Sequence, residues 1–576
     1  MSKKRKVDSP PSAPVAPETA RRLSDQLLLA SFMALAFLLG VTQIADTDIW
    51  WHLRTGELIL ERGEIPQTDW FTYTNPDSPW IDLHWGFQLM LTLVWRAGGA
   101  AAVILATATC GAATFALLIG IRRPQWSVPI SVACLIPSLL LYAGRYHPRP
   151  EMLTQLLLVV VLGILFRARS QPRIVWLLPL VQLLWVNVHS LFILGWMAWG
   201  AFLVDALARR WGPGFLRSKD ETPDTLNDAK RWGLISGLML AANLMNPYGV
   251  TGLTFPLVVF TRISSERDFY VQHAGEFQSM GEFLSMYGKG ALFTSLSPLM
   301  LVVISAAALV SFGLLASKRR LPLDRLLLFA AFGYLAWQAN RNAALFALVG
   351  GWAVRLNLGE WSDLRPAVAP TAAPTAAPSA ASTWGRNAVM VGLSLMLLAM
   401  PLEIFSMLRP IAYPLRIRML ALDEVPDWHA HDASRFLARE GMPQRVYAMH
   451  LGQAAVYLFH NGPQRKVFAD PRLEVNTRET LQRSLDVMRE LVQHDPKAEA
   501  DLRIGIPPDA SGEQELPALL MDRSTVASIL QQLWSNPRWR LVYSDPSSLV
   551  FLSNQQADKL GLRQLSLSEA VNSAAD

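Results

Sequence analysis

Charged residues and cysteines are both scarce in this sequence. Asp, Glu, Lys and Arg together supply 17% of the 576 residues, whereas a soluble protein usually has about 25%. Hydrophobic residues reach 51%, which excludes disorder and a collagen-like chain. The two cysteines, Cys110 and Cys134, each lie in an apolar run, so no disulfide framework is indicated. The chain instead contains long apolar segments and 20 tryptophans, which is typical of a protein that spans a membrane.

Apolar segments recur along most of the chain. About eleven of them approach the roughly 20 residues that a helix needs to cross a bilayer. They lie at 27–45, 98–121, 128–144, 152–166, 174–188, 191–207, 232–245, 291–316, 321–337, 343–356 and 388–405. Segment 250–260 is apolar but too short to cross, so we expect it to lie on the membrane or to re-enter it. The first segment is either a cleaved signal peptide or an uncleaved anchor, and we favour the anchor because no clear cleavage site follows it.

Basic residues fall on every second connection between these segments. They cluster at 3–6, 21–22, 122–123, 167–173, 209–231 and 318–320. Because cytoplasmic loops carry such an excess, we place the N-terminus inside. The outer side then receives loops 46–83, 145–151, 187–190, 246–290 and 338–342, together with the C-terminal region. Membrane topology thus accounts for the net charge of +6, and we expect no nucleic acid as a partner.

The composition changes twice after residue 360. We divide the chain into a basic cytoplasmic tail (1–22), a transmembrane core (23–360) with a first outer loop (46–84), an Ala/Pro-rich linker (361–384), a last transmembrane helix (385–408), a soluble domain (420–555) and a tail (556–576). Strands are predicted at 445–450, 466–469, 518–521, 540–543 and 549–552, and helices at 475–492 and 524–534. The fold class is therefore an α-helical polytopic membrane protein with a small C-terminal α/β extracytoplasmic domain.

Two acids stand at the start of the first outer loop. Asp46 and Asp48 directly follow the first apolar segment, and a helix lying at the membrane surface is predicted after them. Ionised side chains at this depth cost free energy, so they are normally solvated, paired with an opposite charge or retained for function. They either end the span and cap the next helix, or they serve as a general base or as ligands of a divalent cation that holds phosphate.

Other outer loops place polar residues on the same side. Arg145, His147, Arg149 and Glu151 share one short turn, and Asn187, His189, Glu276 and Arg341 come from three further loops. Arginine pairs bind phosphate oxygens in a bidentate manner, so the set suits an anionic lipid-phosphate headgroup. For each residue the alternative is a charge or a histidine that merely ends a span, with Arg341 reaching to the interface.

A sequence pattern in the first outer loop resembles a known family. The stretch Asp46-Thr47-Asp48-Ile49-Trp50-Trp51-His52-Leu53 follows one N-terminal span and opens an interfacial helix. It is similar to polytopic membrane glycosyltransferases of the GT-C superfamily, and more closely to a branch of bacterial membrane proteins. That branch's pattern continues at 63–66, 69–74, 149–150, 185–189, 246–249, 276–277, 341–342 and 467–472. His84 stands where the pattern has Glu.

The resemblance implies a GT-C-like core, a bacterial inner (cytoplasmic) membrane location and sugar transfer on the extracytoplasmic face. The donor would be a polyprenyl-phosphate sugar, and the acceptor a hydroxyl of a glycan, lipid or protein. Asp46 or Asp48 would be the general base of an inverting displacement, and Arg145, Arg149 or Arg341 would stabilise the leaving phosphate. Residues expected at the substrate are His52, Arg54, His84, Arg145, His147, Arg149, Asn187, His189, Glu276 and Arg341. The resemblance leaves open whether a divalent cation binds, and Asp46, Asp48 and His189 are its candidate ligands.

Three other functions fit the same pattern. A transporter of lipid-linked glycans would also need arginines on the outer side. A polymerase or ligase that uses a polyprenyl diphosphate glycan would depend on arginines more than on an acid. A non-catalytic envelope scaffold would depend on residues 420–576 and not on Asp46.

Overall fold

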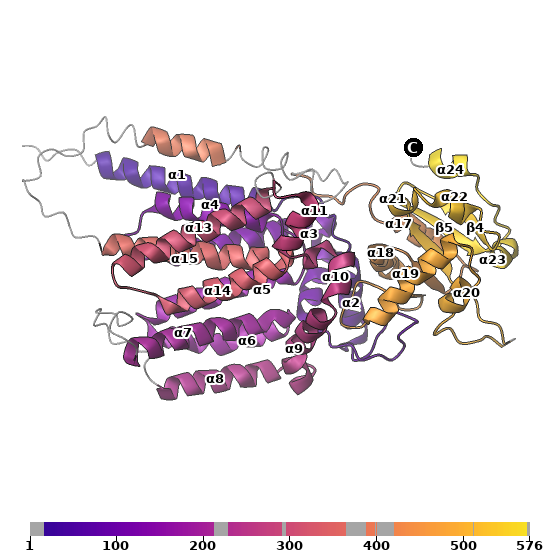
Figure 1. Cartoon of the computed structure of the whole chain (residues 1–576), viewed down its shortest axis with the longest axis horizontal. Helices are drawn as coiled ribbons and strands as arrows, with labels where there is room; N and C mark the ends of the chain where they lie inside the picture. Colours follow the sequence, from indigo (N-terminus) through magenta and orange to yellow (C-terminus); the bar gives the residue numbers. More distant parts are fainter. Residues whose placement is uncertain are drawn as a thin grey trace, which may run out of the picture.

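The computed structural model describes residues 16–211, 229–290, 295–364, 387–397, 399, 420–510 and 512–572. Its first part is a helix bundle and its second part a small α/β domain, joined end to end (Figure 1). Of the expected linker (361–384), residues 365–384 lie outside the described residues. Of the expected last transmembrane helix (385–408), residues 387–397 and 399 are described.

The bundle is made of helices that coincide with the predicted apolar segments. They are α1 (Ala16–Leu38), α3 (Trp85–Gly120), α4 (Val128–Ala143), α5 (Glu151–Ala168), α6 (Leu178–Val186), α7 (Ile193–Trp211), α8 (Ala229–Leu244), α13 (Leu296–Ser317), α14 (Leu323–Gln338), α15 (Ala343–Asp363) and an unlabelled helix over Asn387–Leu397. Within the described residues, four helical stretches are long and apolar enough to cross a membrane, namely Trp85–Gly120, Glu151–Ala168, Ser190–Trp211 and Leu296–Ser317. The chain is therefore a helical membrane protein, while the total of eleven crossings stays a prediction.

Short helices gather at the end of the bundle that faces the α/β domain (Figure 1). They are α2 (Asp48–Arg62), α9 (Gly249–Ser265), α10 (Arg267–His273), α11 (Met280–Tyr287) and the 3-10 turns η2 (Ser190–Phe192), η4 (Gly275–Phe277) and η5 (Asn340–Asn342). A further 3-10 turn of the bundle, η1 (Pro172–Leu177), precedes α6. Segment 250–260, expected on the membrane, forms most of α9 and exposes Val250, Leu257 and Phe260.

A glycine pair divides α3 into two parts. Gly98 and Gly99 have non-helical backbone angles, and Gly99 has a φ of +58°, which glycine adopts without strain. The part before the kink packs against α2, and the part after it enters the bundle. The part after the kink coincides with the predicted apolar segment 98–121.

The C-terminal domain has one mixed five-stranded sheet in the order β2-β1-β3-β5-β4. The strands are β1 (Arg445–Ala448), β2 (Lys466–Val467), β3 (Ala518–Asp522), β4 (Trp539–Ser544) and β5 (Ser548–Ser553), and each lies within or overlaps a predicted strand. The helices are α17 (His431–Leu437), α18 (Leu451–Asn461), α19 (Arg478–Val492), α20 (Lys497–Leu502), α21 (Arg523–Val526), α22 (Leu530–Trp534), α23 (Asn554–Lys559) and α24 (Leu567–Asn572). The last two lie partly or wholly in the expected tail (556–576), and Ala557 and Ala570 on them are buried, so the domain extends beyond residue 555.

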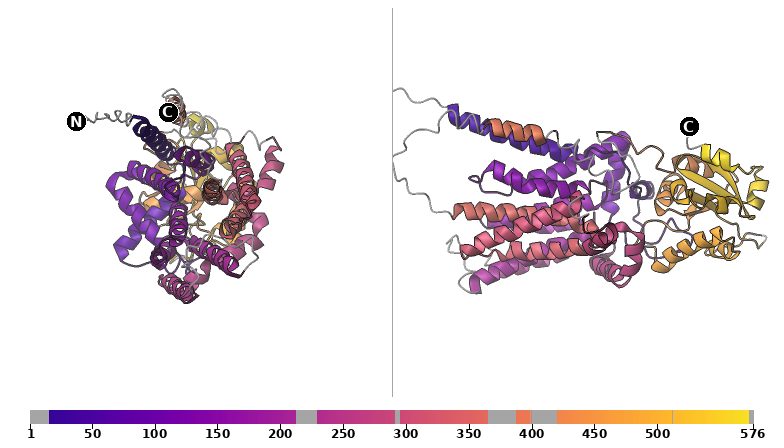
Figure 2. Two further views of the ribbon diagram at one scale, coloured as in Figure 1. Left: turned by 90° about the vertical axis from the view of Figure 1, so that its left-hand side faces the viewer. Right: turned by 45° about the horizontal axis from the view of Figure 1, so that its top comes forward.

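The first outer loop is bound to this domain rather than free. Thr72 pairs in parallel with Val467, and Tyr73 N–H donates to the Val467 carbonyl at 3.0 Å, so the loop extends the sheet beyond β2. The Arg472 guanidinium is fully buried between the carboxylates of Asp69 and Asp470. The guanidinium carbon of Arg472 also lies 4.2 Å from the centroid of the Trp80 ring. Figure 2 shows the resulting short connection between bundle and domain.

Substitution of Arg472 tests this junction. Arg472→Ala leaves two buried carboxylates without their cation, and we expect the free energy of unfolding to fall by about 3–5 kcal/mol. Thermal unfolding of the full-length protein in detergent measures the loss. The control is Arg483→Ala, which breaks an exposed pair with Glu479 and is expected to cost less than about 1 kcal/mol. Equal losses in the two variants would contradict a structural role for Arg472.

Cysteine labelling tests the orientation. A cysteine in place of Gln464, which is exposed in the α/β domain, is expected to react with a membrane-impermeant maleimide in intact cells. A cysteine in place of Lys318, exposed between α13 and α14, is expected to react only after the cells are permeabilised. The reverse pattern would invert the topology.

Candidate functional site

Six of the predicted site residues meet at the end of the bundle that faces the α/β domain. Asp46 and Asp48 lie where the chain leaves α1 and begins α2, and Asp48 N–H donates to Asp46 Oδ1 at 3.1 Å. Arg145 and Arg149 lie in the turn between α4 and α5, Glu276 in η4 and Arg341 in η5. Each is at a helix end, which explains how residues far apart in sequence converge on one place.

Arg149 joins the two aspartates. Its Nε and Nη2 donate to the two carboxylate oxygens of Asp46, the second at 2.9 Å, and Nη2 also lies 3.0 Å from Asp48 Oδ2. Asp46 is therefore held from two sides by Arg149 and by a backbone N–H group. Asp48 has one contact with the same guanidinium and keeps its other oxygen available.

The two carboxyl groups consequently differ in proton affinity. Burial would raise the pKa of Asp46, but the charge and hydrogen bonds of Arg149 outweigh it and hold that pKa well below its usual value. Burial raises the pKa of Asp48 to about 7, and the nearby charges of Asp46, Glu276 and Glu474 add to this effect while Arg149 opposes it. Asp46 is thus ionised at neutral pH, whereas Asp48 exchanges a proton there.

Glu151 and Glu276 bind the remaining arginines. Glu151 accepts from Arg145 Nη2 and from Arg341 Nη2, each at 2.7 Å. Glu276 lies further from its partners, at 3.5 Å from Arg145 Nη1, 3.5 Å from Arg341 Nη1 and 3.7 Å from Arg149 Nη1. We call Asp46, Asp48, Arg145, Arg149, Glu151, Glu276 and Arg341 the acid–arginine cluster. Beside it, burial lowers the pKa of His147 to about 4, so this imidazole is neutral at pH 7.

Three further histidines form a neighbouring group. The ring of His84 lies 5.9 Å from that of His52 and 5.3 Å from that of His189. His189 Nδ1 is 2.7 Å from Thr154 Oγ1, which also accepts from Trp185 Nε1 at 2.8 Å. Burial lowers the pKa of His189 to about 3. Burial also acts to lower the pKa of His84, but the carboxylate of Asp82, 3.5 Å from His84 Nδ1, and the charge of Glu474 raise it overall.

Two predicted site residues lie apart from the acid–arginine cluster. Arg54 pairs with Glu57 at 2.9 Å and donates to the Gly462 carbonyl at 2.8 Å, so it contacts the α/β domain. Asn187 accepts from Trp85 Nε1 at 3.1 Å and donates to the Met245 carbonyl at 3.1 Å. It connects three segments of the bundle end instead of facing the arginines.

The donor groups do not fit a divalent cation in this arrangement. Among the described residues, no three His, Cys, Asp or Glu side chains converge as metal ligands. Asp46 is already bound by Arg149, whose positive charge opposes a second cation at this carboxylate. The three expected ligands Asp46, Asp48 and His189 are therefore not assembled around a common point.

Sequence reasoning missed the contribution of the α/β domain. Glu474 Oε1 lies 3.7 Å from His84 Nδ1, and its charge also acts on Asp48. Gly452, on α18, lies so close to Thr47 that a Cβ atom there would be 2.3 Å from the threonine Oγ1. The residue between the two aspartates thus touches the domain. Only the quoted 467–472 pattern pointed to this neighbourhood.

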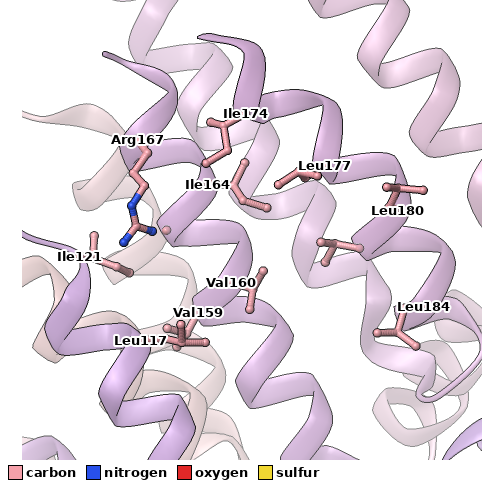
Figure 3. A pocket seen from close by; sticks show the side chains of 12 residues that line it. Leu117, Ile121, Val159, Val160, Ile164, Arg167, Ile174, Leu177, Leu180 and Leu184 are labelled. Atoms are coloured by element: carbon pink, nitrogen blue, oxygen red, sulfur yellow. The ribbon is translucent and has the colours of Figure 1, made fainter. Parts of the chain in front are cut away.

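An apolar groove of about 440 Å³ lies elsewhere in the bundle. It is lined by α3, α5, η1 and α6, with Arg167 at its edge (Figure 3). Glu151 and Arg167 occupy opposite ends of α5 and are about 24 Å apart along the helix. The groove residue of α5 nearest to Glu151 in sequence is Val159, about 12 Å away along the helix, and the groove lining includes none of the residues of the acid–arginine cluster.

Comparisons with known proteins identify the fold. No protein-family model and no curated protein matches the chain. The oligosaccharyltransferase of Archaeoglobus fulgidus in its apo form matches with a TM-score of 0.52 and 12% identity, over 91% of this chain and 74% of that one. The same archaeal protein, tethered through a disulfide bond to an acceptor peptide containing the NVT sequon, matches with a TM-score of 0.49 and 14% identity over the same shares. The chain thus shares the overall fold of this archaeal oligosaccharyltransferase.

The unequal aspartates predict opposite effects on stability. The pKa of Asp48 rises from the usual 3.8 to about 7, so ionisation of Asp48 destabilises the folded state as pH rises between these values. At pH 8 we expect Asp48→Asn to raise the free energy of unfolding by about 1–2 kcal/mol. This gain should be smaller at pH 5 and disappear only below about pH 3.8, because the unfolded chain keeps Asp48 ionised down to that pH.

Asp46 should behave in the opposite way because its pKa is lowered. Asp46→Asn is expected to destabilise the protein at both pH values, since Arg149 loses its main partner. Thermal unfolding of both variants in detergent at pH 5 and pH 8 provides the measurement. If Asp48→Asn were as damaging as Asp46→Asn at pH 8, the two acids would be equivalent structural partners of Arg149.

Proposed function

We propose that this protein is a membrane glycosyltransferase that moves a sugar from a polyprenyl-phosphate donor to an acceptor hydroxyl on the extracytoplasmic face. The observation that carries the proposal is the unequal pair of carboxyl groups on Arg149. One is fixed in its ionised form, and the other has a pKa of about 7. A general base works best when its pKa lies near the working pH, so Asp48 is the base and Asp46 positions Arg149.

The reaction follows from these roles. Asp48 accepts the proton of the acceptor hydroxyl while the oxygen attacks the anomeric carbon of the donor. The bond between that carbon and the phosphate oxygen breaks with its electron pair going to the phosphate. One displacement of this kind inverts the configuration of the anomeric carbon.

The leaving phosphate needs positive charge, and the acid–arginine cluster contains three guanidinium groups. Arg145, Arg149 and Arg341 lie within 3.7 Å of the same carboxylate, that of Glu276. Fixed cations at the place where charge develops lower the barrier, and loss of one such group typically costs about 10²–10³ in rate. The arginines can thus supply electrostatic stabilisation with groups of this chain.

The location of the cluster suits a lipid-linked donor. It lies where the bundle ends and the short helices begin, so a charged headgroup can occupy it while the isoprenoid tail stays in the bilayer. The α/β domain borders the same place through Glu474 and Gly452. We propose that this domain guides the acceptor, which is a glycan, a lipid or a protein, and that the protein resides in a bacterial cytoplasmic membrane.

The fold supports glycosyl transfer over the other functions considered. The archaeal protein with the same fold is, by its name, an oligosaccharyltransferase. A shared fold alone is an analogy, but here it accompanies a buried acid of suitable pKa beside three arginines. A non-catalytic scaffold has no need for such an acid.

Turnover and its pH dependence test the proposal. With polyprenyl-phosphate sugars and the purified protein, we expect kcat/KM to rise with pH and to level off above about 7, because Asp48 must be ionised. Asp48→Asn is expected to lower turnover by about 10²–10⁴-fold and to remove this pH step. Asp46→Asn should also lower turnover, because it releases Arg149.

Asp558→Asn, an exposed change in the α/β domain, is the matched control and should leave turnover unchanged. Full activity in Asp46→Asn, Asp48→Asn and the double variant would refute the assigned roles. Sugar-lipid movement across vesicles that persists in Asp48→Asn, without any transfer by the wild type, would instead support a transporter.

A further inference from the structure

Glu276 occupies an unusual position in the acid–arginine cluster. Each of the three arginines directs its Nη1 atom to this one carboxylate, at 3.5 Å for Arg145 and Arg341 and 3.7 Å for Arg149. All three distances are longer than the roughly 2.7–2.9 Å of a good charge-assisted hydrogen bond. The three cations therefore surround Glu276 without binding it tightly.

Glu151 shows what a tight partner looks like in the same place. It accepts from the Nη2 atoms of Arg145 and Arg341 at 2.7 Å each. Asp46 similarly accepts from Arg149 at 2.9 Å and through a second, shorter bond. Each arginine thus has at least one close carboxylate partner that fixes its position, and directs its Nη1 atom to Glu276.

The number of oxygen atoms explains the loose contacts. A carboxylate has two oxygens, so Oε2 of Glu276 is shared by Arg145 and Arg149 while Oε1 faces Arg341. The phosphodiester of the donor offers two non-bridging oxygens and the ester oxygen to the sugar, which becomes a third terminal oxygen as the sugar leaves, so each guanidinium can then have its own acceptor. Three convergent nitrogens therefore match a phosphate better than they match Glu276.

The segment around Glu276 permits the side chain to leave while the backbone stays. Phe277 is buried beneath the guanidinium of Arg341, 5.1 Å from it, and Asn340 N–H donates to the Gln278 carbonyl at 3.0 Å. Gly275 on the other side is exposed, and a Cβ atom added to it would meet only open space. The Glu276 side chain itself is 28% exposed, so it has a path to solvent.

We propose that Glu276 is a displaceable place-holder for the phosphate group of the lipid-linked donor. The inference rests on the proposed function, because it assigns the donor's phosphate to the three arginines. In the resting protein Glu276 balances their charge, which would otherwise be partly uncompensated. When the donor enters, its phosphate takes the three Nη1 atoms and the Glu276 side chain turns toward solvent.

Binding of the leaving group gives a direct test that needs no sugar transfer. The probe is undecaprenyl monophosphate, titrated into full-length protein in detergent by calorimetry. Because Glu276→Gln removes a competing negative charge, we expect it to bind the probe about tenfold more tightly than the wild type. The matched variant Glu151→Gln frees Arg145 and Arg341 from their anchor and is expected to bind about tenfold more weakly.

Two further ligands distinguish the contribution of the phosphate group from that of the isoprenoid tail. Undecaprenol, which lacks phosphate, should bind Glu276→Gln and wild type equally. Inorganic phosphate should compete only weakly, and competition as strong as that of the lipid would overturn the assignment to a lipid headgroup. Glu276→Ala repeats the test, because the amide of Glu276→Gln can form contacts of its own. Both variants are first checked for an unchanged melting temperature.

The outcomes also separate the inference from the proposed function. Weaker or unchanged probe binding in both Glu276 variants would overturn the place-holder, even if the wild type transfers sugar. Tighter binding in these variants together with no transfer by the wild type would uphold the phosphate site and remove the proposed catalytic role.

Discussion

Arg149 and its two carboxylate partners determine the chemistry of this end of the bundle. The guanidinium binds Asp46 through two nitrogens and reaches Asp48 through one. Because a single cation cannot compensate two buried anions equally, it fixes one acid in its ionised form and leaves the other able to exchange a proton. The inequality arises from position alone, since both residues have the same side chain and lie two positions apart.

A second buried arginine links this site to the α/β domain. Arg472 binds Asp69 of the first outer loop and Asp470 of its own segment, and the loop adds its backbone to the sheet at Val467. The loop that begins with the two aspartates is therefore held at both ends, by Arg149 in the bundle and by Arg472 in the domain. An acceptor bound by the domain would meet Asp48 across a short and well-fixed distance, which positions groups better than a flexible linker would.

The sequence identified those features that depend on local pattern. Apolar runs and basic loops placed the helices, and the position of Asp46, Arg149 and Arg341 at span ends placed them on one side. It missed features that depend on packing. Helix α18, which brings Gly452 against Thr47, was not predicted, and Glu474 carried no signal of its own. The difference between Asp46 and Asp48 could not be predicted either, because it follows from which oxygen meets which guanidinium nitrogen.

The charges of the acid–arginine cluster also explain how transfer could proceed without separating charge. At rest, four carboxyl groups face three guanidiniums, and a proton on Asp48 makes this set neutral. Under the proposed function, a phosphodiester donor carries one negative charge and would replace Glu276 without changing the total. Once Asp48 has released its proton, the departing phosphate would gain a second negative charge at the same moment as Asp48 becomes neutral by accepting the acceptor's proton. Because the two changes cancel within the cluster, the surrounding low-dielectric region experiences no net change in charge during the displacement, which is the condition under which a buried site stabilises a transition state at least cost.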